Sequence, residues 1–274
     1  MRPLTDWPLA DRRQLLGIFT DIDDTLTTNG AITPDALQAL ADLKAAGLRV
    51  IPITGRPLGW SEPMACGNLA QGLAPWPVDA LVAENGAAAF VPNRAHPDRP
   101  PLKIFQQDAD TRALNYRRLQ AVAQQVLREV PGTRLSQDSA GRETDIAIDH
   151  SEFTQLAPDK IASVVGLMQA AGLQASVSSI HINGWIGKHN KRDGARWIVR
   201  ELFGRTLDFE LAQWAFIGDS TNDQLMFTHF AHSVGVANVR HFEAQLKPPP
   251  RYITPGLRGA GFTEMAHAII SAKI

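Results

Sequence analysis

Three carboxylates stand close together near the start of the chain, directly after an apolar run. The segment GIFTDIDDTLTTNG, residues 17–30, places Asp21, Asp23 and Asp24 just beyond Phe19. Like charges at this spacing repel each other, and a carboxylate withdrawn from water is unfavourable unless a cation or hydrogen-bond donors compensate its charge. The segment therefore predicts a site that binds a cation from outside the chain.

Polar groups also follow two other apolar runs. Thr54 ends the run LRVIPIT, and Asp219 ends the run WAFIGD. In an open parallel sheet, ligands bind beyond the carboxyl ends of the strands. If the three runs are parallel strands, Asp21, Thr54 and Asp219 come together at one edge of the sheet.

The elements that must position these residues alternate between strand and helix patterns. Segment 33–47 predicts a helix, with Thr33 as N-cap, Pro34 at the first helical position and Gly47 just beyond the end. Later strands are expected at 80–87, 214–219, 232–237 and 251–255, and later helices at 191–204, 221–230 and 262–274. This alternation predicts an α/β fold with a doubly wound parallel-sheet, Rossmann-like core.

Residues 89–186 have a different texture. They predict a helix at 109–130, a strand at 141–149, a helix at 158–172 and paired strands within 173–187. This order is typical of an α+β unit. We therefore expect an inserted cap domain at 89–186, which divides the core domain into 1–88 and 187–274.

Composition excludes several classes of protein. The chain has 274 residues, of which 44% are hydrophobic and 20% charged, and no apolar stretch reaches the roughly 18 residues of a membrane span. The net charge of -1 offers no general attraction to nucleic acid or to an anionic membrane. Cys66 is the single cysteine, so an internal disulfide is excluded.

With no signal-peptide pattern at the N-terminus, a cytoplasmic protein with a small-molecule partner is expected. Composition does not indicate the oligomeric state.

The motifs resemble those of the haloacid dehalogenase superfamily of phosphohydrolases. Its first motif, Asp-x-Asp-x-Thr after an apolar strand, is similar to Asp21-Ile22-Asp23-Asp24-Thr25. The second, a Ser or Thr closing the next strand, looks like Thr54, and the third, a lysine, looks like Lys188 in GWIGKHNKRDG. The fourth looks like Asp219 and Asp223 in FIGDSTND.

The spacing of these motifs resembles one branch of the superfamily. Residues 55–187 leave room for a cap after the second motif, whereas residues 26–33 leave none after the first. This resembles the type IIB branch with a large α/β cap, which includes sucrose-phosphate and mannosyl-3-phosphoglycerate phosphatases. The resemblance implies a phosphatase, a Mg²⁺-dependent phosphomonoester hydrolase that acts on a small phosphosugar or related phosphorylated metabolite.

The resemblance also assigns roles to residues of this sequence. Asp21 is expected to be the nucleophile that forms an aspartyl-phosphate, and Asp23 the general acid and base. Mg²⁺ is expected on the side chains of Asp21 and Asp219 and the main-chain carbonyl of Asp23, with Asp223 directly or through water. The phosphoryl group is expected to contact Thr54, Gly55, Lys188 and Asn222.

Several assignments remain open. Lys191 is an alternative to Lys188 as the catalytic lysine, because both lie in the segment GKHNKR. Contacts with the rest of the substrate are expected from Arg56 and Asn85 in the core and from Arg142, Glu143, His181 and Asn183 in the inserted segment. The competing functions are a phosphosugar mutase on the same core and a receiver-like regulatory protein with a phosphorylated aspartate. A mutase of this type usually carries its cap after the first motif, and a receiver has no need of an acid such as Asp23.

Overall fold

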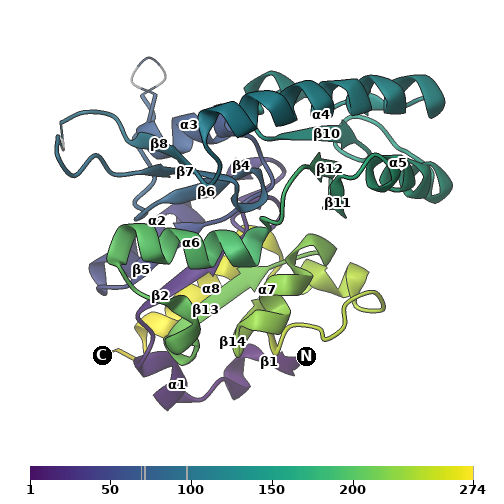
Figure 1. The fold of residues 1–274 in the computed structure, drawn as a ribbon. Coiled ribbons are helices and arrows are strands. Elements are labelled where there is room, and N and C mark those ends of the chain that lie inside the picture. Colours follow the sequence, from purple (N-terminus) through teal and green to yellow (C-terminus); the bar gives the residue numbers. More distant parts are fainter. Residues whose placement is uncertain (69, 71, 97, 274) are drawn as a thin grey trace.

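The central sheet of the protein is parallel throughout. The computed structural model describes residues 1–273 except 69, 71 and 97. Six strands pair in the order β1-β15-β14-β13-β2-β5, each parallel to its neighbours. They are β1 (Arg2–Pro3), β2 (Gly17–Thr20), β5 (Arg49–Pro52), β13 (Trp214–Gly218), β14 (His232–Gly235) and β15 (Tyr252–Ile253). The predicted parallel core is confirmed, and Figure 1 shows its sheet between two layers of helices.

Helices cover both faces of this sheet because successive side chains of a strand point to opposite faces. Ile18 of β2 packs into one buried cluster, and its neighbour Phe19 packs into the other. The first cluster lies under α2 (Pro34–Ala45) and α8 (Arg258–Ile270), and the second under α6 (Lys191–Phe203) and α7 (Gln224–His229). Two further helices are α1 (Leu9–Arg13), which contacts α8, and α3 (Leu58–Cys66). Over the described residues, no helix combines the length and apolar character needed to cross a membrane.

Two small antiparallel units flank the sheet. Directly after the first acidic motif, β3 (Thr27–Thr28) and β4 (Ala31–Ile32) form a short hairpin. Beyond β5, a parallel bridge from Ile53 to Val82 leads to three strands that pair in sequence order. These are β6 (Leu81–Ala83), β7 (Ala88–Val91) and β8 (Leu102–Phe105).

The predicted domain boundary at residue 89 falls inside β7. Ala89 and Val91 belong to the same buried cluster as Ile53 and α6, and β7 pairs with both β6 and β8. The turn at Glu84–Gly86 folds β7 back onto β6. Strand β7 therefore still belongs to the core, and the chain enters the inserted segment only later. Because β8 pairs with β7, the inserted segment begins after β8 and not at residue 89.

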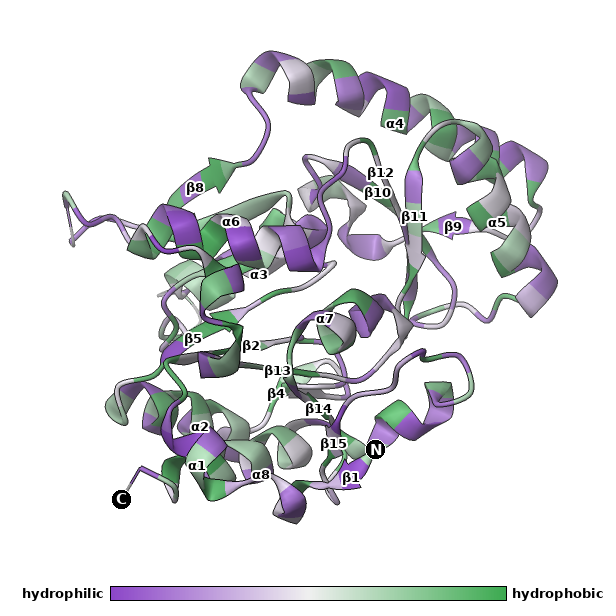
Figure 2. Cartoon of the chain, turned by 60° about the horizontal axis from the view of Figure 1, so that its bottom comes forward, coloured by the Kyte–Doolittle hydropathy of each residue, from purple (hydrophilic) through white to green (hydrophobic). Residues whose placement is uncertain are grey.

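The inserted segment between β8 and α6, which we call the cap, is a four-stranded antiparallel sheet with two helices on one face. The strand order is β11-β12-β10-β9. Helices α4 and α5 share a third buried cluster with this sheet. Figure 2 shows hydrophilic and hydrophobic residues alternating along α4, as expected for a helix with one buried face. The elements are α4 (Ala109–Glu129), β9 (Arg134–Leu135), β10 (Asp145–Asp149), α5 (Pro158–Ala170), β11 (Gln174–Val177) and β12 (His181–Trp185).

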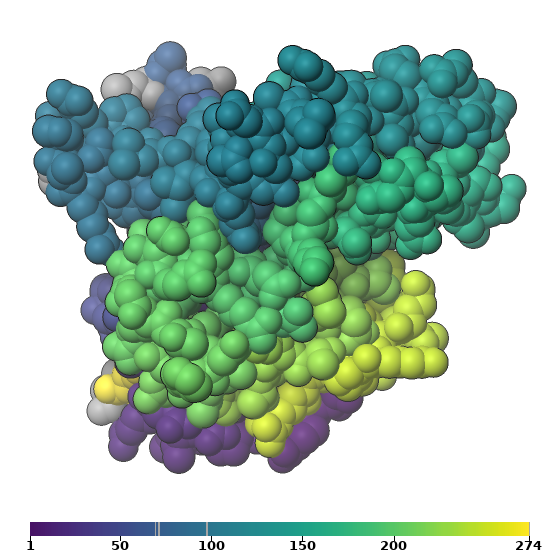
Figure 3. Space-filling view, viewed as in Figure 1, coloured from purple at the N-terminus to yellow at the C-terminus, as the bar shows by residue number. Residues whose placement is uncertain are grey.

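The cap lies across the core, as the space-filling view shows (Figure 3), and a buried carboxylate joins the two. Glu84, which follows β6, is 0% exposed and accepts hydrogen bonds from the main-chain N–H groups of Glu143 and Thr144 in the cap. Its oxygens also accept from the Thr144 hydroxyl and from the N–H of Leu58. Hydrogen bonds to a charged group are among the stronger ones. Glu84 therefore fixes one side of the cap to the core.

Two glycines bring α6 against the turn that holds Glu84. A Cβ atom on Gly194 of α6 would lie 2.5 Å from the Cα atom of Gly86, and Gly86 has a φ of +102°. Neither position has space for a side chain. This contact fixes how closely α6 packs against the turn at Glu84–Gly86. It thereby fixes the position of Lys191, the first residue of α6.

We predict opposite effects of one substitution in two helices. Gly194→Ala should lower the free energy of unfolding by roughly 1–3 kcal/mol, because the added methyl group collides with main-chain atoms. A Cβ atom on Gly166 of α5 would meet no atom within 4 Å. Gly166→Ala should therefore raise the free energy of unfolding by about 0.5–1 kcal/mol, because alanine favours the helix. Urea unfolding of both variants measures the difference, and equal effects of the two substitutions would contradict the close packing of α6.

Candidate active site

Adjacent strand ends bring the predicted residues together. Asp21 follows β2, Thr54 follows β5, and Asp219 follows β13, and β2 lies between the other two strands. The N–H of Asp21 still donates to the carbonyl of Ile217 at 2.9 Å, so this residue is held by the sheet ladder. All three side chains are buried. The expected meeting of these residues at one edge of the sheet is observed.

Asp21, Asp219 and Asp223 form a buried acidic cluster. Each offers a carboxylate oxygen, and these oxygens all lie within 4.8 Å of one another. Asp223 is already held, since one of its oxygens accepts from the N–H of Asp219 at 2.9 Å and the other accepts from Lys191. By contrast, Oδ1 of Asp219 is buried and has no hydrogen-bond partner among the described residues. An oxygen-only cluster with one free carboxylate oxygen fits a hard cation such as Mg²⁺.

The structure places Lys191, and not Lys188, at this cluster. The Nζ atom of Lys191 lies 2.5 Å from Oδ1 of Asp21 and 2.8 Å from Oδ1 of Asp223. The side chain of Lys188 is exposed. The difference arises at the start of α6, where Asn190 is the N-cap and accepts a hydrogen bond from the N–H of Asp193. The assignment of Lys188 is corrected to the alternative, Lys191.

Burial shapes the charge of the cluster. Desolvation raises the pKa of Asp21 to about 8, against the lowering effect of Lys191. Burial likewise raises the pKa of Asp219, and the charges of Asp21 and Asp223 add to this. For Lys191, burial favours the neutral form, but the two carboxylates outweigh it and the pKa is raised above its ordinary value. One lysine thus faces three carboxyl groups, and burial disfavours the charged forms of Asp21 and Asp219 unless a further cation joins the cluster.

Four of the predicted phosphate-binding and catalytic residues share one small pocket with the nucleophile candidate. Thr54, Gly55, Asn222 and Asp23 line it together with Asp21, and its volume is about 10 Å³. The Thr54 hydroxyl accepts a hydrogen bond from the N–H of Arg56. Such a volume holds about one water molecule. The structure therefore represents a closed arrangement of cap and core.

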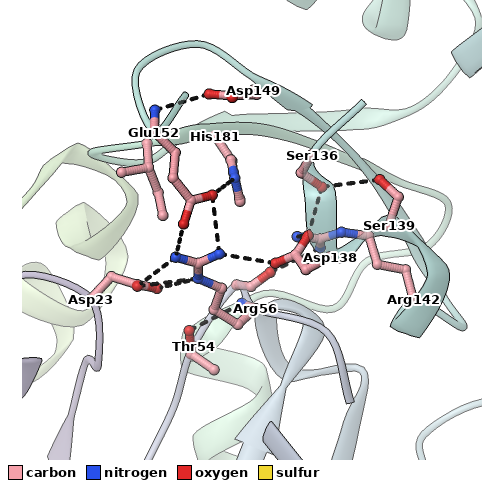
Figure 4. Close-up of polar contacts among 12 residues, drawn as sticks. Asp23, Thr54, Arg56, Ser136, Asp138, Ser139, Arg142, Asp149, Glu152 and His181 are labelled. Atoms are coloured by element: carbon pink, nitrogen blue, oxygen red, sulfur yellow. Dashed lines mark hydrogen bonds and ion pairs between the residues drawn. The ribbon is translucent and has the colours of Figure 1, made fainter. Parts of the chain in front are cut away.

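Arg56 closes this pocket by joining core and cap (Figure 4). Its guanidinium lies 3.0 Å from Asp23, 3.1 Å from Asp138 and 2.7 Å from Glu152. His181 lies 2.8 Å from Glu152 through Nε2. Arg56 and His181 thus border the site, but their polar atoms are engaged by acids of the protein.

The two cap acids of this network stay charged at neutral pH. Burial raises the pKa of Glu152, but the hydrogen bonds from His181 and Arg56 outweigh it and bring the pKa to about 2. For Asp138 the charge of Arg142 and a hydrogen bond from Ser136 overcome burial in the same way, and the pKa is again about 2. The closed arrangement is therefore held by charged partners.

Two cap residues expected to bind substrate, Arg142 and Asn183, donate to the Gly55 carbonyl. Arg142 donates to both oxygens of Asp145, at 2.8 and 3.0 Å, and also to the carbonyl of Gly55 at 3.1 Å. Asn183 donates to the same carbonyl at 3.2 Å and to Asp145 at 3.1 Å. A buried arginine needs such a partner to offset its desolvation. Arg142 is thus not available as the free carboxylate ligand that the sequence suggested.

The remaining two candidates differ in position. Asn85 has a φ of 55°, a conformation that asparagine tolerates, and its N–H donates to the carbonyl of Thr54 at 3.0 Å. It therefore borders the site. The side chain of Glu143 is 42% exposed and lies 3.8 Å from Lys103, away from the residues that line the small pocket. The prediction of a substrate contact for Glu143 finds no support in this arrangement.

Sequence reasoning missed several residues that support the site. Asn238 donates to Oδ2 of Asp219 at 3.2 Å and to the carbonyl of Asp24 at 3.0 Å. It follows β14, so the rule applied to the other strand ends would have found it. Glu152 and Asp138 carried no such signal, because they lie in cap loops far along the chain from Arg56.

The comparisons with known proteins give a sequence match over part of the chain and a similarity of fold over nearly all of it. Residues 18–98 match the sequence profile of the haloacid dehalogenase-like hydrolases. Among curated proteins no match is found.

Solved structures of similar fold cover almost the whole chain. A protein from Thermoplasma acidophilum has 16% identity and a TM-score of 0.67 over 94% of this chain and 99% of its own. The sucrose-phosphatase of Synechocystis, solved with sucrose and phosphate, has 18% identity and a TM-score of 0.63 over 94% and 98%. A haloacid dehalogenase subclass IIB sugar phosphatase has 17% identity and a TM-score of 0.60 over 93% and 99%. Residues 18–98 thus match the haloacid dehalogenase-like hydrolases in sequence, and the whole chain is similar in fold to these solved structures.

Proposed function

We propose that the protein is a Mg²⁺-dependent phosphatase that hydrolyses a small phosphosugar through an aspartyl-phosphate on Asp21. The observation that carries the proposal is the arrangement around Asp21: a buried lysine on one of its oxygens and a free carboxylate oxygen of Asp219 nearby. Two proteins of similar fold are described as a sucrose-phosphatase and a sugar phosphatase. Their fold and the residues of this chain support the same class of reaction.

The residues of the chain divide the reaction into two displacements. An oxygen of Asp21 attacks phosphorus, the bond to the leaving oxygen breaks, and Asp23 gives its proton to that oxygen. Asp23 then takes a proton from a water molecule, whose oxygen attacks the phosphoaspartate and releases orthophosphate and free Asp21. Lys191 and Thr54 hold the phosphoryl oxygens during both steps.

Mg²⁺ would be held by Asp21 and Asp219, with the carbonyl of Asp23 and with Asp223 directly or through water. When bound, it neutralises part of the charge shared by the phosphate dianion and the carboxylates. Asp219 is oriented for this by Asn238.

The closed arrangement requires the cap to move. A pocket of about 10 Å³ cannot hold a phosphate ester. Because the fork of Arg56 contacts both oxygens of Asp23, at least one of them must be released before Asp23 can meet a leaving group. Substrate entry therefore separates Arg56 from Asp23 or from the cap acids Asp138 and Glu152.

We expect phosphate release from a panel of phosphosugars in the presence of Mg²⁺ and none with excess chelator. Mg²⁺ should also raise the thermal unfolding midpoint, because it binds the folded state alone. Asp219→Asn should lose both effects, since it removes the charge of the carboxylate whose oxygen is free. Full turnover in metal-free buffer would contradict the proposal.

The two lysines of the segment GKHNKR provide a matched pair. Lys191→Met should lower kcat on p-nitrophenyl phosphate by roughly 10²-fold or more, because it removes the cation beside the nucleophile. Lys188→Met should leave kcat within about threefold, as expected for a side chain exposed to water. Steady-state kinetics of both purified variants decides the assignment, and the reverse order would restore Lys188.

Asp23→Asn should reduce turnover by about 10²–10⁴-fold with alkyl phosphates, because no proton reaches the leaving oxygen. The loss should be smaller with p-nitrophenyl phosphate, whose leaving group needs little protonation. Since the substitution also breaks the pair with Arg56, Arg56→Ala serves as the control, and it should affect both substrates equally. An equal loss with both substrates for Asp23→Asn would show that Asp23 is not the acid.

A further inference from the structure

A second cavity lies beside the candidate active site, between cap and core. It has a volume of about 350 Å³, and we call it the side pocket. Its walls include Asn85, Ser176, Lys188, His189, Lys191 and Asn222. The volume is within the range of small-molecule sites.

The side pocket adjoins the groups that would hold a phosphoryl group. Asn222 lines both this pocket and the small one at Asp21. Lys191 lines the side pocket and contacts Asp21 through its Nζ atom. Asn85 also borders both regions, because a Cβ atom on Gly55 would lie 3.1 Å from its Oδ1 atom. A group leaving Asp21 past Lys191 therefore enters this cavity.

Three buried polar atoms of the wall have no hydrogen-bond partner among the described residues. They are Nδ2 of Asn85, Oγ of Ser176 and Nε2 of His189. Asn85 is only 3% exposed and His189 only 6%. Buried polar groups are nearly always hydrogen-bonded, and leaving one unpaired costs about 1–3 kcal/mol. Three such atoms around one cavity indicate that it binds a polar ligand.

The charge of the wall indicates that this ligand is an anion. No aspartate or glutamate is among the described residues that line the side pocket. Lys188 stands at it with an exposed side chain, and it forms no ion pair with any residue that the structure describes. The small pocket, by contrast, is lined by the carboxylates of Asp21 and Asp23, and its one arginine, Arg56, is paired with Asp23 and the cap acids Glu152 and Asp138. An anion is thus favoured in the side pocket and disfavoured beside these carboxylates.

We propose that the side pocket binds orthophosphate and serves as the exit for this product while the cap is closed. The proposal rests on the proposed function, which releases orthophosphate at Asp21. With the cap closed, the small pocket has no room for the product, whereas the side pocket does. A tetrahedral dianion accepts several hydrogen bonds at once, which matches the amide of Asn85, the hydroxyl of Ser176 and the ammonium of Lys188.

The test is calorimetric titration of the full chain with inorganic phosphate in the presence of Mg²⁺. The parent protein should bind two phosphates per chain, one at Asp21 and one in the side pocket. Lys188→Glu and Ser176→Val should weaken the second by roughly fivefold or more and keep the first. Arg118→Glu, the same change of charge on an exposed residue of α4, should bind as the parent does. A single phosphate in the parent, or unchanged binding in Lys188→Glu, would overturn the proposal.

Kinetics gives an independent readout. Orthophosphate should inhibit hydrolysis of p-nitrophenyl phosphate in a mixed pattern in the parent and a competitive pattern in Lys188→Glu, with kcat/KM within about twofold. If Lys188→Glu instead raises KM only for phosphosugars that carry a second acidic group, the pocket holds substrate and the exit proposal is wrong. If the chain hydrolyses no ester, the proposed function fails, and the titration alone still decides whether the pocket binds phosphate.

Discussion

A cluster of three buried carboxyl groups is the feature on which the rest of this structure depends. Asp21, Asp219 and Asp223 are withdrawn from water within one cluster, and Lys191 is the cation set against them. Such an arrangement is stable only if each oxygen meets a donor or a metal ion. The N–H groups at the end of β13, the amide of Asn238 and the first residue of α6 supply most of these partners. Oδ1 of Asp219 has no hydrogen-bond donor among the described residues, so it is the atom of the cluster that a bound cation would satisfy.

The placement of α6 follows from this constraint. Lys191 reaches the cluster only if the start of α6 lies close enough to the sheet. The contact between Gly194 of α6 and Gly86 in the turn after β6 fixes that distance. The same turn carries Glu84, which holds the cap by main-chain N–H groups. Lys191 and the cap are thus both fixed to one short segment of the core. A change in cap position is therefore transmitted to the turn beside Lys191.

The cap also contacts the turn at Gly55 directly. Arg142 and Asn183 both donate to the carbonyl of Gly55 and share the carboxylate of Asp145. Arg56 makes the second link, from the core to the cap acids. Residues of the cap therefore support the geometry of the core site when the cap is closed.

Apolar periodicity and polar residues after strands are local patterns, and they were enough to predict the parallel core, the strand ends that carry Asp21, Thr54 and Asp219, and an inserted segment. The choice between Lys188 and Lys191 could not be made from such patterns, since it depends on where α6 begins and how deeply it packs. Burial decided the role of Arg142 in the same way: a buried guanidinium pairs with the nearest carboxylate, Asp145, and this partner comes from the folding of the cap. Pairings across the cap and core, such as Arg56 with Glu152, join residues distant in the chain, and no periodicity in the sequence encodes them.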